Sequence, residues 1–241
     1  MPHTRIQERR DRLSLLFKCL IGALSLFGVI FACATATQDG YSAWYKRLLY
    51  FTQQSNIWIG VTALLSVLYT VHPTLRKKAR TRTVLHALTY IFTVSITLTG
   101  VIFCALLAPF AEENIWTFSS LITHVAVPIL AIADLFVCDA HEPLPRLCTL
   151  LSLVSPFLYY VVSIGLGAMG VDFGKGETYP YFFMDLSTGL HPFGYRWGGD
   201  RPELGPLWWV VVLLLFILGV ASLYYALHPS TRRKKRKNQA S

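Results

Sequence analysis

Six apolar segments, each long enough to cross a lipid bilayer, constrain this chain more than any other feature of its sequence. A bilayer core about 30 Å thick needs roughly 20 mainly apolar helical residues. Segments of this kind lie at about 13–36, 48–71, 83–108, 115–138, 147–169 and 204–228. The composition agrees, because only 15% of the 241 residues are charged and 54% are hydrophobic, whereas a soluble domain carries about 25% charge. We therefore expect an all-α, polytopic integral membrane protein: one six-helix membrane domain, residues 1–241, in a plasma or inner cell membrane.

The basic residues predict how this bundle is oriented, since Lys and Arg collect on the cytoplasmic side. The N-terminus, the loops at 72–82 and 139–146, and the tail at 229–241 hold 17 of the 22 basic residues (5, 5, 1 and 6). The opposite face holds most of the acids, including Glu112 and Glu113. We expect both termini in the cytoplasm and the loop at about 170–203 outside. The basic blocks flank span ends, so they indicate topology and contact with anionic lipids rather than with nucleic acid.

The first segment has a basic start and small residues near Cys33, as a signal peptide does. Its apolar run is longer than a signal peptide needs, and its removal would leave an odd number of spans, so we expect a retained helix. The five cysteines, at 19, 33, 104, 138 and 148, have no Cys-x-x-Cys spacing. They predict neither a zinc site nor a disulfide framework, and we expect no metal or other cofactor.

Polar side chains inside the spans point to function, because an unpaired hydroxyl or imidazole in hydrocarbon is costly. The second span opens with the run Thr52-Gln53-Gln54-Ser55-Asn56. On a helix, Thr52, Ser55 and Asn56 share one face with Gly60. The fourth span contains His124. Both features fall in the outer half of the bundle, so the sequence predicts that they can meet.

Two interpretations of this pair follow from the residues alone. Intramembrane Thr often bonds its own i−4 carbonyl, and a lone His can be a satisfied donor between helices. The alternative is a catalytic pair in which neutral His124 takes the proton of a Thr52 nucleophile. Catalysis requires the two side chains to lie within about 2.6–3.2 Å of each other.

Neither nearby acid completes a triad on spacing alone. Asp134 is ten residues from His124, which is about 15 Å along a helix and roughly 80° around it, so it cannot orient the ring. We expect Asp134 near the cytoplasmic end, paired with Lys or Arg or partly hydrated. Asp185, just after the run Tyr179–Met184 in the outer loop, is the better candidate. Simple solvation at the surface is the alternative for Asp185.

Together these residues resemble the androgen-induced-gene and ADTRP family and its six-span bacterial relatives. The resemblance is carried by Phe51-Thr52 with Gln54-Ser55-Asn56, by His124 with Pro128, and by Tyr179-Pro180-Tyr181, in that order, over roughly 45–230. It implies an atypical threonine hydrolase that cleaves esters of fatty acids with hydroxy fatty acids, with Thr52 as nucleophile and His124 as base. The animal members lack the Gln-Gln-Ser-Asn stretch and have Glu where Asp134 and Asp185 stand, so the substrate can differ.

The sequence thus favours a hydrolase of lipid esters that works within the membrane, with membrane lipids as its partners. Gln53, Ser55 and Asn56 are candidates to donate hydrogen bonds to the oxyanion, and Tyr181 and Asp185 are candidates to support the site or bind substrate. One alternative is a non-enzymatic transporter of a small solute or lipid, although broken helices at matching positions in two halves are not evident. Another is a structural or regulatory membrane protein whose polar groups only join helices.

Overall fold

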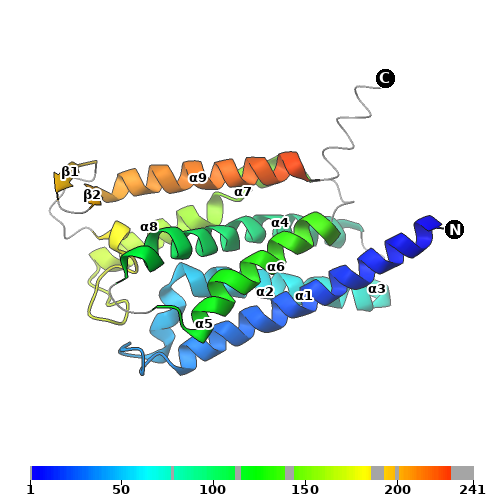
Figure 1. Cartoon of the computed structure of the whole chain (residues 1–241), viewed down its shortest axis with the longest axis horizontal. Coiled ribbons are helices and arrows are strands. Elements are labelled where there is room, and N and C mark those ends of the chain that lie inside the picture. The colour runs from blue at the N-terminus through cyan, green and yellow to red at the C-terminus, as the bar shows by residue number, and fades with distance from the viewer. Residues whose placement is uncertain are drawn as a thin grey trace, which may run out of the picture.

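The computed structural model describes residues 2–76, 79–111, 115–138, 144–185, 193–198 and 201–228. Its helices run along one long axis, and a two-stranded ribbon lies at one end (Figure 1). Within the described residues, six helices are long and apolar enough to cross a membrane: Glu8–Ala34, Phe51–Val71, Ala79–Leu107, Phe118–Phe136, Leu147–Ala168 and Pro206–Leu227. These helices confirm the six expected spans, with boundaries that differ by a few residues, and they indicate an integral membrane protein.

The α-helices are α1 (Pro2–Ala34), α2 (Phe51–Val71), α3 (Pro73–Arg76), α4 (Ala79–Ile102), α5 (Phe118–Leu121), α6 (Val127–Ala133), α7 (Leu147–Leu151), α8 (Val154–Ala168) and α9 (Pro206–Leu227). Three-residue-per-turn helix forms η1 (Trp44–Leu49), η3 (Ala108–Phe110) and η6 (Phe182–Met184). Wider π-helical turns form η2 (Phe103–Leu107), η4 (Ile122–Ala126) and η5 (Asp134–Cys138). The strands are β1 (Tyr195–Gly198) and β2 (Arg201–Leu204).

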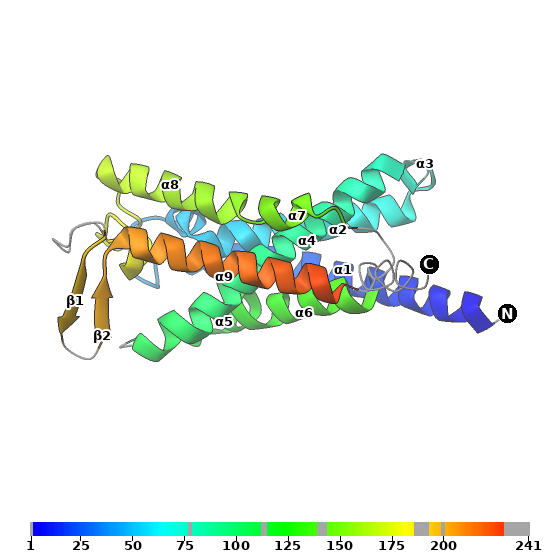
Figure 2. The ribbon, with the colours of Figure 1, turned by 90° about the horizontal axis from the view of Figure 1, so that it is seen from above.

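Successive spans run antiparallel, so the start of α1 and the last turn of α9 lie at the same end of the bundle (Figures 1 and 2). We call this the terminal end. The ribbon, the start of α2 and α5 lie at the other end, which we call the ribbon end. The antiparallel order therefore brings the beginnings of the second and fourth spans to one end of the molecule, as the sequence predicted for Thr52 and His124.

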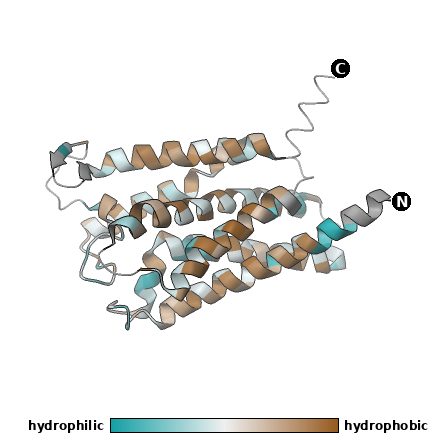
Figure 3. Ribbon diagram, viewed as in Figure 1, coloured by the Kyte–Doolittle hydropathy of each residue, from teal (hydrophilic) through white to brown (hydrophobic). Residues whose placement is uncertain are grey.

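The helices differ in how deeply they are buried. Half of the α4 span is buried against the rest of the chain, but only 17% of the α9 span is. Helix α9 is largely hydrophobic along its length (Figure 3). An apolar helix that is mostly uncovered by protein faces lipid. The first, second and fourth spans with α4 thus form the close-packed part of the bundle, and α8 and α9 form a looser layer against the bilayer.

Small residues allow the close-packed helices to approach one another. A Cβ added at Gly60 of α2 would lie 2.1 Å from Oγ of Ser25 in α1. A Cβ added at Gly100 of α4 would lie 2.8 Å from the backbone oxygen of His124. Glycine is common at such crossings in membranes because it lets backbones pack closely. Gly100 therefore fixes how near α4 lies to the span that carries His124.

The loop at about 170–203 contains regular structure, because η6 and an antiparallel hairpin, in which Tyr195 pairs with Leu204, lie within it and at its end. One sequence expectation needs correction. Lys18 was counted among the flanking basic residues, but it is buried in α1 and its Nζ lies 2.7 Å from the Asp134 carboxylate. The expected basic tail at 229–241, Lys77, Lys78, Glu112 and Glu113 fall outside the described residues.

Candidate active site

Thr52 is the second residue of α2 and is 8% exposed. Tyr50, two residues before Thr52, has an extended backbone (φ −86°, ψ 140°). This extended residue separates the end of η1 from the start of α2. The Tyr50 carbonyl accepts the N–H groups of Gln53 (3.0 Å) and Gln54 (3.2 Å). Because helical bonding begins only there, the N–H groups of Phe51 and Thr52 have no acceptor within the helix. The side chain of Thr52 and its backbone N–H, which has no acceptor within α2, thus lie together at one helix terminus.

His124 lies in the π-helical turn η4 of the fourth span. Its Nε2 is 3.1 Å from Oγ1 of Thr52, which is hydrogen-bonding distance. The structure therefore brings together the two residues that the sequence singled out, which are 72 residues apart in the chain. This contact meets the geometric requirement for a hydroxyl nucleophile and its base.

The other ring nitrogen identifies the tautomer of His124. Nδ1 lies 3.1 Å from the Ser120 carbonyl and 3.1 Å from Oγ1 of Thr123. A carbonyl oxygen only accepts, and the Thr123 hydroxyl donates its hydrogen to the Ser119 carbonyl at 2.9 Å. We infer from this network that Nδ1 carries the hydrogen and that Nε2 is an acceptor. The Thr52 hydroxyl then donates to Nε2, as a nucleophile does to its base.

An aromatic pair fixes the plane of this imidazole. Phe103, in the π turn η2, stacks on His124 with ring centroids 3.9 Å apart and planes 21° apart. Trp116 meets the edge of Phe103 at 5.1 Å. The stacked ring holds Nε2 toward Thr52 and excludes water from that face of the imidazole.

Asn56 and Ser55 hold the start of α2 against the neighbouring spans, and neither lines the cavity beside Thr52. Nδ2 of Asn56 donates to the carbonyls of Thr52 (2.8 Å) and Thr123 (3.2 Å), so it joins α2 to the turn that carries His124. Oγ of Ser55 lies 3.1 Å from the Thr52 carbonyl and 2.8 Å from the Thr99 hydroxyl. Gln53 is buried, but it does not line the cavity at Thr52. In this structure the Ser55 and Asn56 side chains bond to other groups, and the role of the three residues as oxyanion donors stays a prediction.

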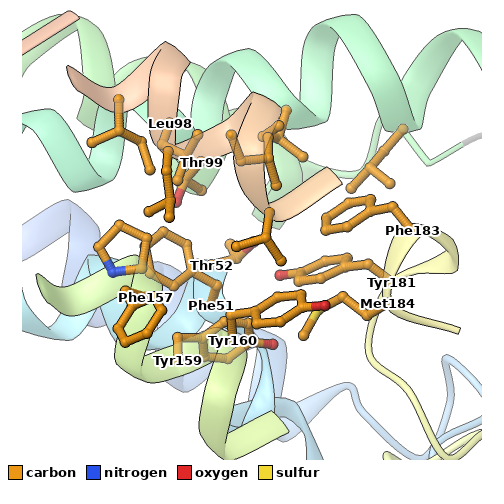
Figure 4. Close-up of a pocket in the computed structure, with 17 residues that line it drawn as sticks. Phe51, Thr52, Leu98, Thr99, Phe157, Tyr159, Tyr160, Tyr181, Phe183 and Met184 are labelled. Carbon is orange, nitrogen blue, oxygen red and sulfur yellow. The ribbon is translucent and has the colours of Figure 1, made fainter. Parts of the chain in front are cut away.

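A narrow apolar cavity opens beside Thr52 (Figure 4). It runs between α4, α8 and α9, and most of its lining is aliphatic or aromatic. The lining residues are Phe51, Thr52, Leu98, Thr99, Ile102, Leu107, Pro156, Phe157, Tyr159, Tyr160, Tyr181, Phe183, Met184, Val210, Leu213, Leu214 and Ile217. Since α8 and α9 form the layer against the bilayer, this cavity suits a hydrocarbon chain that arrives from the membrane.

Tyr181 reaches this cavity from the loop between α8 and β1, with its hydroxyl directed toward Thr52 (Figure 4). Burial raises the pKa of Tyr181 to about 12, although hydrogen bonds with the side chain and backbone N–H of Thr52 act in the opposite direction. The phenol is therefore neutral at physiological pH and keeps a hydrogen to donate.

Three aromatic rings hold Tyr181 in place. Phe183 stacks on it with centroids 5.2 Å apart, Tyr50 meets its edge at 5.7 Å, and Tyr159 lies 6.4 Å away. The sequence singled out Tyr181 through the Tyr-Pro-Tyr run, but it gave no indication that the hydroxyl reaches Thr52.

Asp172 ties the same loop to the segment that precedes α2. Its carboxylate accepts the N–H groups of Gly174 (2.7 Å) and Gly176 (2.9 Å) and the Ser42 hydroxyl (3.0 Å). The hydrogen bond from Gly174 is the largest cause that lowers the Asp172 pKa, and burial opposes it. Lys46 also donates to the Asp172 carbonyl. These bonds connect the loop that carries Tyr181 to the chain that leads into Thr52.

The two acids take different places from His124. Asp134 pairs with Lys18 at 2.7 Å and accepts from Ser14 at 3.3 Å, which is one of the environments expected for it. Asp185 lies close enough to Tyr179 to help raise the pKa of that phenol. The ring of His124 is oriented by the Ser120 carbonyl, and a supporting role for Asp185 stays a prediction. A backbone carbonyl has no sequence signal, which is why this partner was missed.

The described residues contain no group of three or more His, Cys, Asp or Glu side chains arranged to hold a metal ion. Comparison with protein families, curated proteins and solved structures gives no match to this chain.

Proposed function

We propose that this protein is an intramembrane hydrolase of lipid esters, with Thr52 as nucleophile and His124 as base. The observation that carries the proposal is the 3.1 Å contact between Oγ1 of Thr52 and Nε2 of His124. Its support is the hydrogen-bond network that leaves Nε2 free to accept a proton. A residue pair that served only to join helices would not require this tautomer or a cavity beside the hydroxyl.

The reaction follows from this arrangement. His124 takes the proton of Thr52 as Oγ1 attacks the acyl carbon and the carbonyl electrons move onto oxygen. When these electrons return, the bond to the alcohol breaks and His124 gives its proton to the leaving alkoxide, which leaves an acyl ester on Thr52. Water then attacks that ester with His124 again as base, and the products are a carboxylic acid and the restored hydroxyl.

The cavity supports a lipid substrate. Its lining is almost wholly hydrocarbon and aromatic, and it lies between α4 and the two helices that face the bilayer. A long acyl chain that enters from the bilayer exchanges one apolar environment for another, so its transfer into this lining carries little desolvation cost. Through the resemblance in Thr52, His124 and Tyr181, we further propose kinship with the androgen-induced-gene and ADTRP hydrolases, and esters of fatty acids with hydroxy fatty acids as substrates.

We also propose that both termini are cytoplasmic and that the site lies in the outer half of a plasma or inner cell membrane. The support is the collection of basic residues at the termini and at 72–82. Reporter fusions at the C-terminus and within the loop at 170–203 test this orientation. A reporter at the C-terminus that is active only outside would overturn it.

The test of the chemistry uses purified protein in lipid nanodiscs with a series of fatty-acid esters. Thr52→Ala and His124→Ala are expected to abolish turnover without loss of folded protein, and Thr52→Ser is expected to keep partial activity because it preserves the hydroxyl. A fluorophosphonate probe should label wild type at residue 52. Thr62→Ala, a buried threonine further along α2, is the matched control and should keep full activity and labelling.

Two outcomes contradict the proposal. Labelling or turnover that persists in Thr52→Ala places the nucleophile elsewhere. A wild-type protein that neither turns over esters nor reacts with the probe favours a transporter or a structural role, in which Thr52 and His124 only join two helices.

A further inference from the structure

We propose that Tyr181 is a catalytic residue, and that its phenol and the backbone N–H of Thr52 together bind the oxyanion formed during ester hydrolysis. This inference rests on the proposed function. It assigns the outer loop a direct part in the reaction, whereas the hydrolytic pair itself lies wholly on the second and fourth spans.

An acyl transfer site needs donors about 2.7–3.1 Å from the developing oxyanion. The side chains expected for this task are engaged elsewhere, because Asn56 binds two carbonyls and Ser55 binds the Thr52 carbonyl and the Thr99 hydroxyl. Two other donors lie beside the Thr52 hydroxyl: its own N–H and the phenol of Tyr181, which is directed toward Thr52 (Figure 4).

The N–H of Thr52 is free of the helix, since the first intrahelical bonds of α2 come from Gln53 and Gln54. In the resting site the phenol of Tyr181 is directed toward Thr52 (Figure 4), and hydrogen bonding with the Thr52 backbone is among the causes that lower the pKa of this phenol. An oxygen atom thus already lies beside this backbone donor. We infer that the carbonyl oxygen of the substrate accepts a hydrogen bond from this N–H when the ester is bound.

The phenol of Tyr181 also lies beside the Thr52 side chain in the same cavity (Figure 4), and hydrogen bonding with that side chain lowers its pKa. In the tetrahedral intermediate, the oxyanion is attached to the carbon that has just bonded to Oγ1 of Thr52. The oxyanion therefore forms next to the atom that the phenol already contacts, and a small shift of the hydroxyl is enough to reach it. The phenol donates a hydrogen bond and transfers no proton, so the electrons of the oxyanion re-form the carbonyl double bond as the alkoxide leaves and takes its proton from His124.

Preorganisation makes such a donor effective, because little reorganisation is then needed as the charge develops. Phe183 stacks against the ring of Tyr181 with planes only 10° apart, and Tyr50 packs against its edge. Phe183 is itself buried in the core with Met184. The loop is thus anchored on both sides of the phenol, by this packing and by the bonds of Asp172.

A second tyrosine in the same cavity provides a matched control. The hydroxyl of Tyr160 donates to the Pro206 carbonyl at 3.2 Å, so it joins α8 to α9 and does not serve Thr52. Tyr160→Phe and Tyr181→Phe remove one hydroxyl each from the lining of one cavity. Only the second substitution removes a donor from the reacting atoms.

The experiment compares wild type, Tyr181→Phe and Tyr160→Phe in nanodiscs. Loss of one oxyanion donor lowers kcat by about 10²–10³-fold, and we expect this loss in Tyr181→Phe with KM changed less than threefold. A long-chain trifluoromethyl ketone, which forms a tetrahedral adduct with Thr52, should lose affinity by a similar factor. The matching long-chain ether, which forms no adduct, should bind both variants as it binds wild type.

Several outcomes overturn this assignment. A kcat for Tyr181→Phe within threefold of wild type refutes it, and equal losses for ketone and ether show that Tyr181 only shapes the cavity. If Tyr181→Phe does not fold, 3-fluorotyrosine at position 181 preserves the shape and strengthens the donor, and an unchanged ketone affinity then refutes the assignment. Activity that persists in Thr52→Ala removes the proposed function itself, whereas inactive Thr52→Ala beside active Tyr181→Phe removes this inference alone. A wild type that is inactive and unlabelled removes both.

Discussion

The ion pair between Lys18 and Asp134 gives a sharp test of the fold, because both charges are buried between α1 and the fourth span. Their side chains are 9% and 1% exposed, and Nζ lies 2.7 Å from Oδ2. At an effective dielectric constant of 20, charges at this separation attract by about 6 kcal/mol. When one partner is removed, the other is left buried, and the measured cost of such changes is about 3–5 kcal/mol.

We therefore expect Lys18→Met and Asp134→Leu each to lower the free energy of unfolding by about 3–5 kcal/mol. The double variant, which buries no charge, should be destabilised less than either single variant. The measurement is reversible unfolding in mixed micelles, followed by tryptophan fluorescence. Lys175→Met, which removes an exposed cation 5.2 Å from the Tyr41 ring, is the control and should cost no more than about 1 kcal/mol.

Two results would refute this reasoning. Single variants that each cost less than about 1 kcal/mol would show that the pair is hydrated and behaves like a surface salt bridge. A double variant whose loss equals the sum of the two single losses would show that the charges do not interact. Turnover should persist in the double variant if it folds, since Asp134 lies about 15 Å along the span from His124.

Four further substitutions test the fold and the site. Gly100→Ala should reduce turnover at least tenfold, because the new Cβ would lie 2.8 Å from the His124 backbone oxygen. At Gly165 the new Cβ would meet nothing within 4 Å, so Gly165→Ala should stabilise its helix by about 0.5–1 kcal/mol in unfolding measurements. Asn56→Ala should lower both turnover and stability, the latter by about 1–3 kcal/mol, through loss of the bonds that join the two spans. Asp172→Asn should make the outer loop more sensitive to proteolysis at neutral pH. The native pKa of Asp172 lies below 3.8, so the stability that the carboxylate adds to the loop is present above that value and is lost as the pH falls through the native pKa. The difference in proteolysis between variant and wild type should therefore vanish in strong acid.

The sequence predicted the parts of this fold that depend on periodicity and length. Six apolar runs gave six spans, and the spacing of Thr52, Ser55 and Asn56 placed them correctly on a buried face of α2. The meeting of Thr52 with His124 followed from antiparallel helices with short connections, which bring the starts of alternate spans to the same end.

The parts that could not be predicted depend on the backbone or on distant pairing. The acceptor that orients His124 is the Ser120 carbonyl, and every residue has a carbonyl. Lys18 was read as a flanking charge because nothing local reveals that Asp134, 116 residues away, stands opposite it. The position of Tyr181 over Thr52 depends on the path of a loop, which apolar periodicity does not specify.

The π-helical turn Ile122–Ala126 has one more consequence, which concerns insertions and deletions. Such a turn accommodates one residue more than an α-helical turn does. Deleting one residue from it would leave an unbroken α-helix whose two halves keep about the same orientation, because the remaining residues cover one ordinary α-helical turn. A one-residue deletion from the regular helix between His124 and Asp134 would instead rotate the two halves by about 100°, and only one of these residues would keep its partner. A homologue that is one residue shorter within this turn should therefore retain both the contact to the hydroxyl of α2 and the buried ion pair to α1.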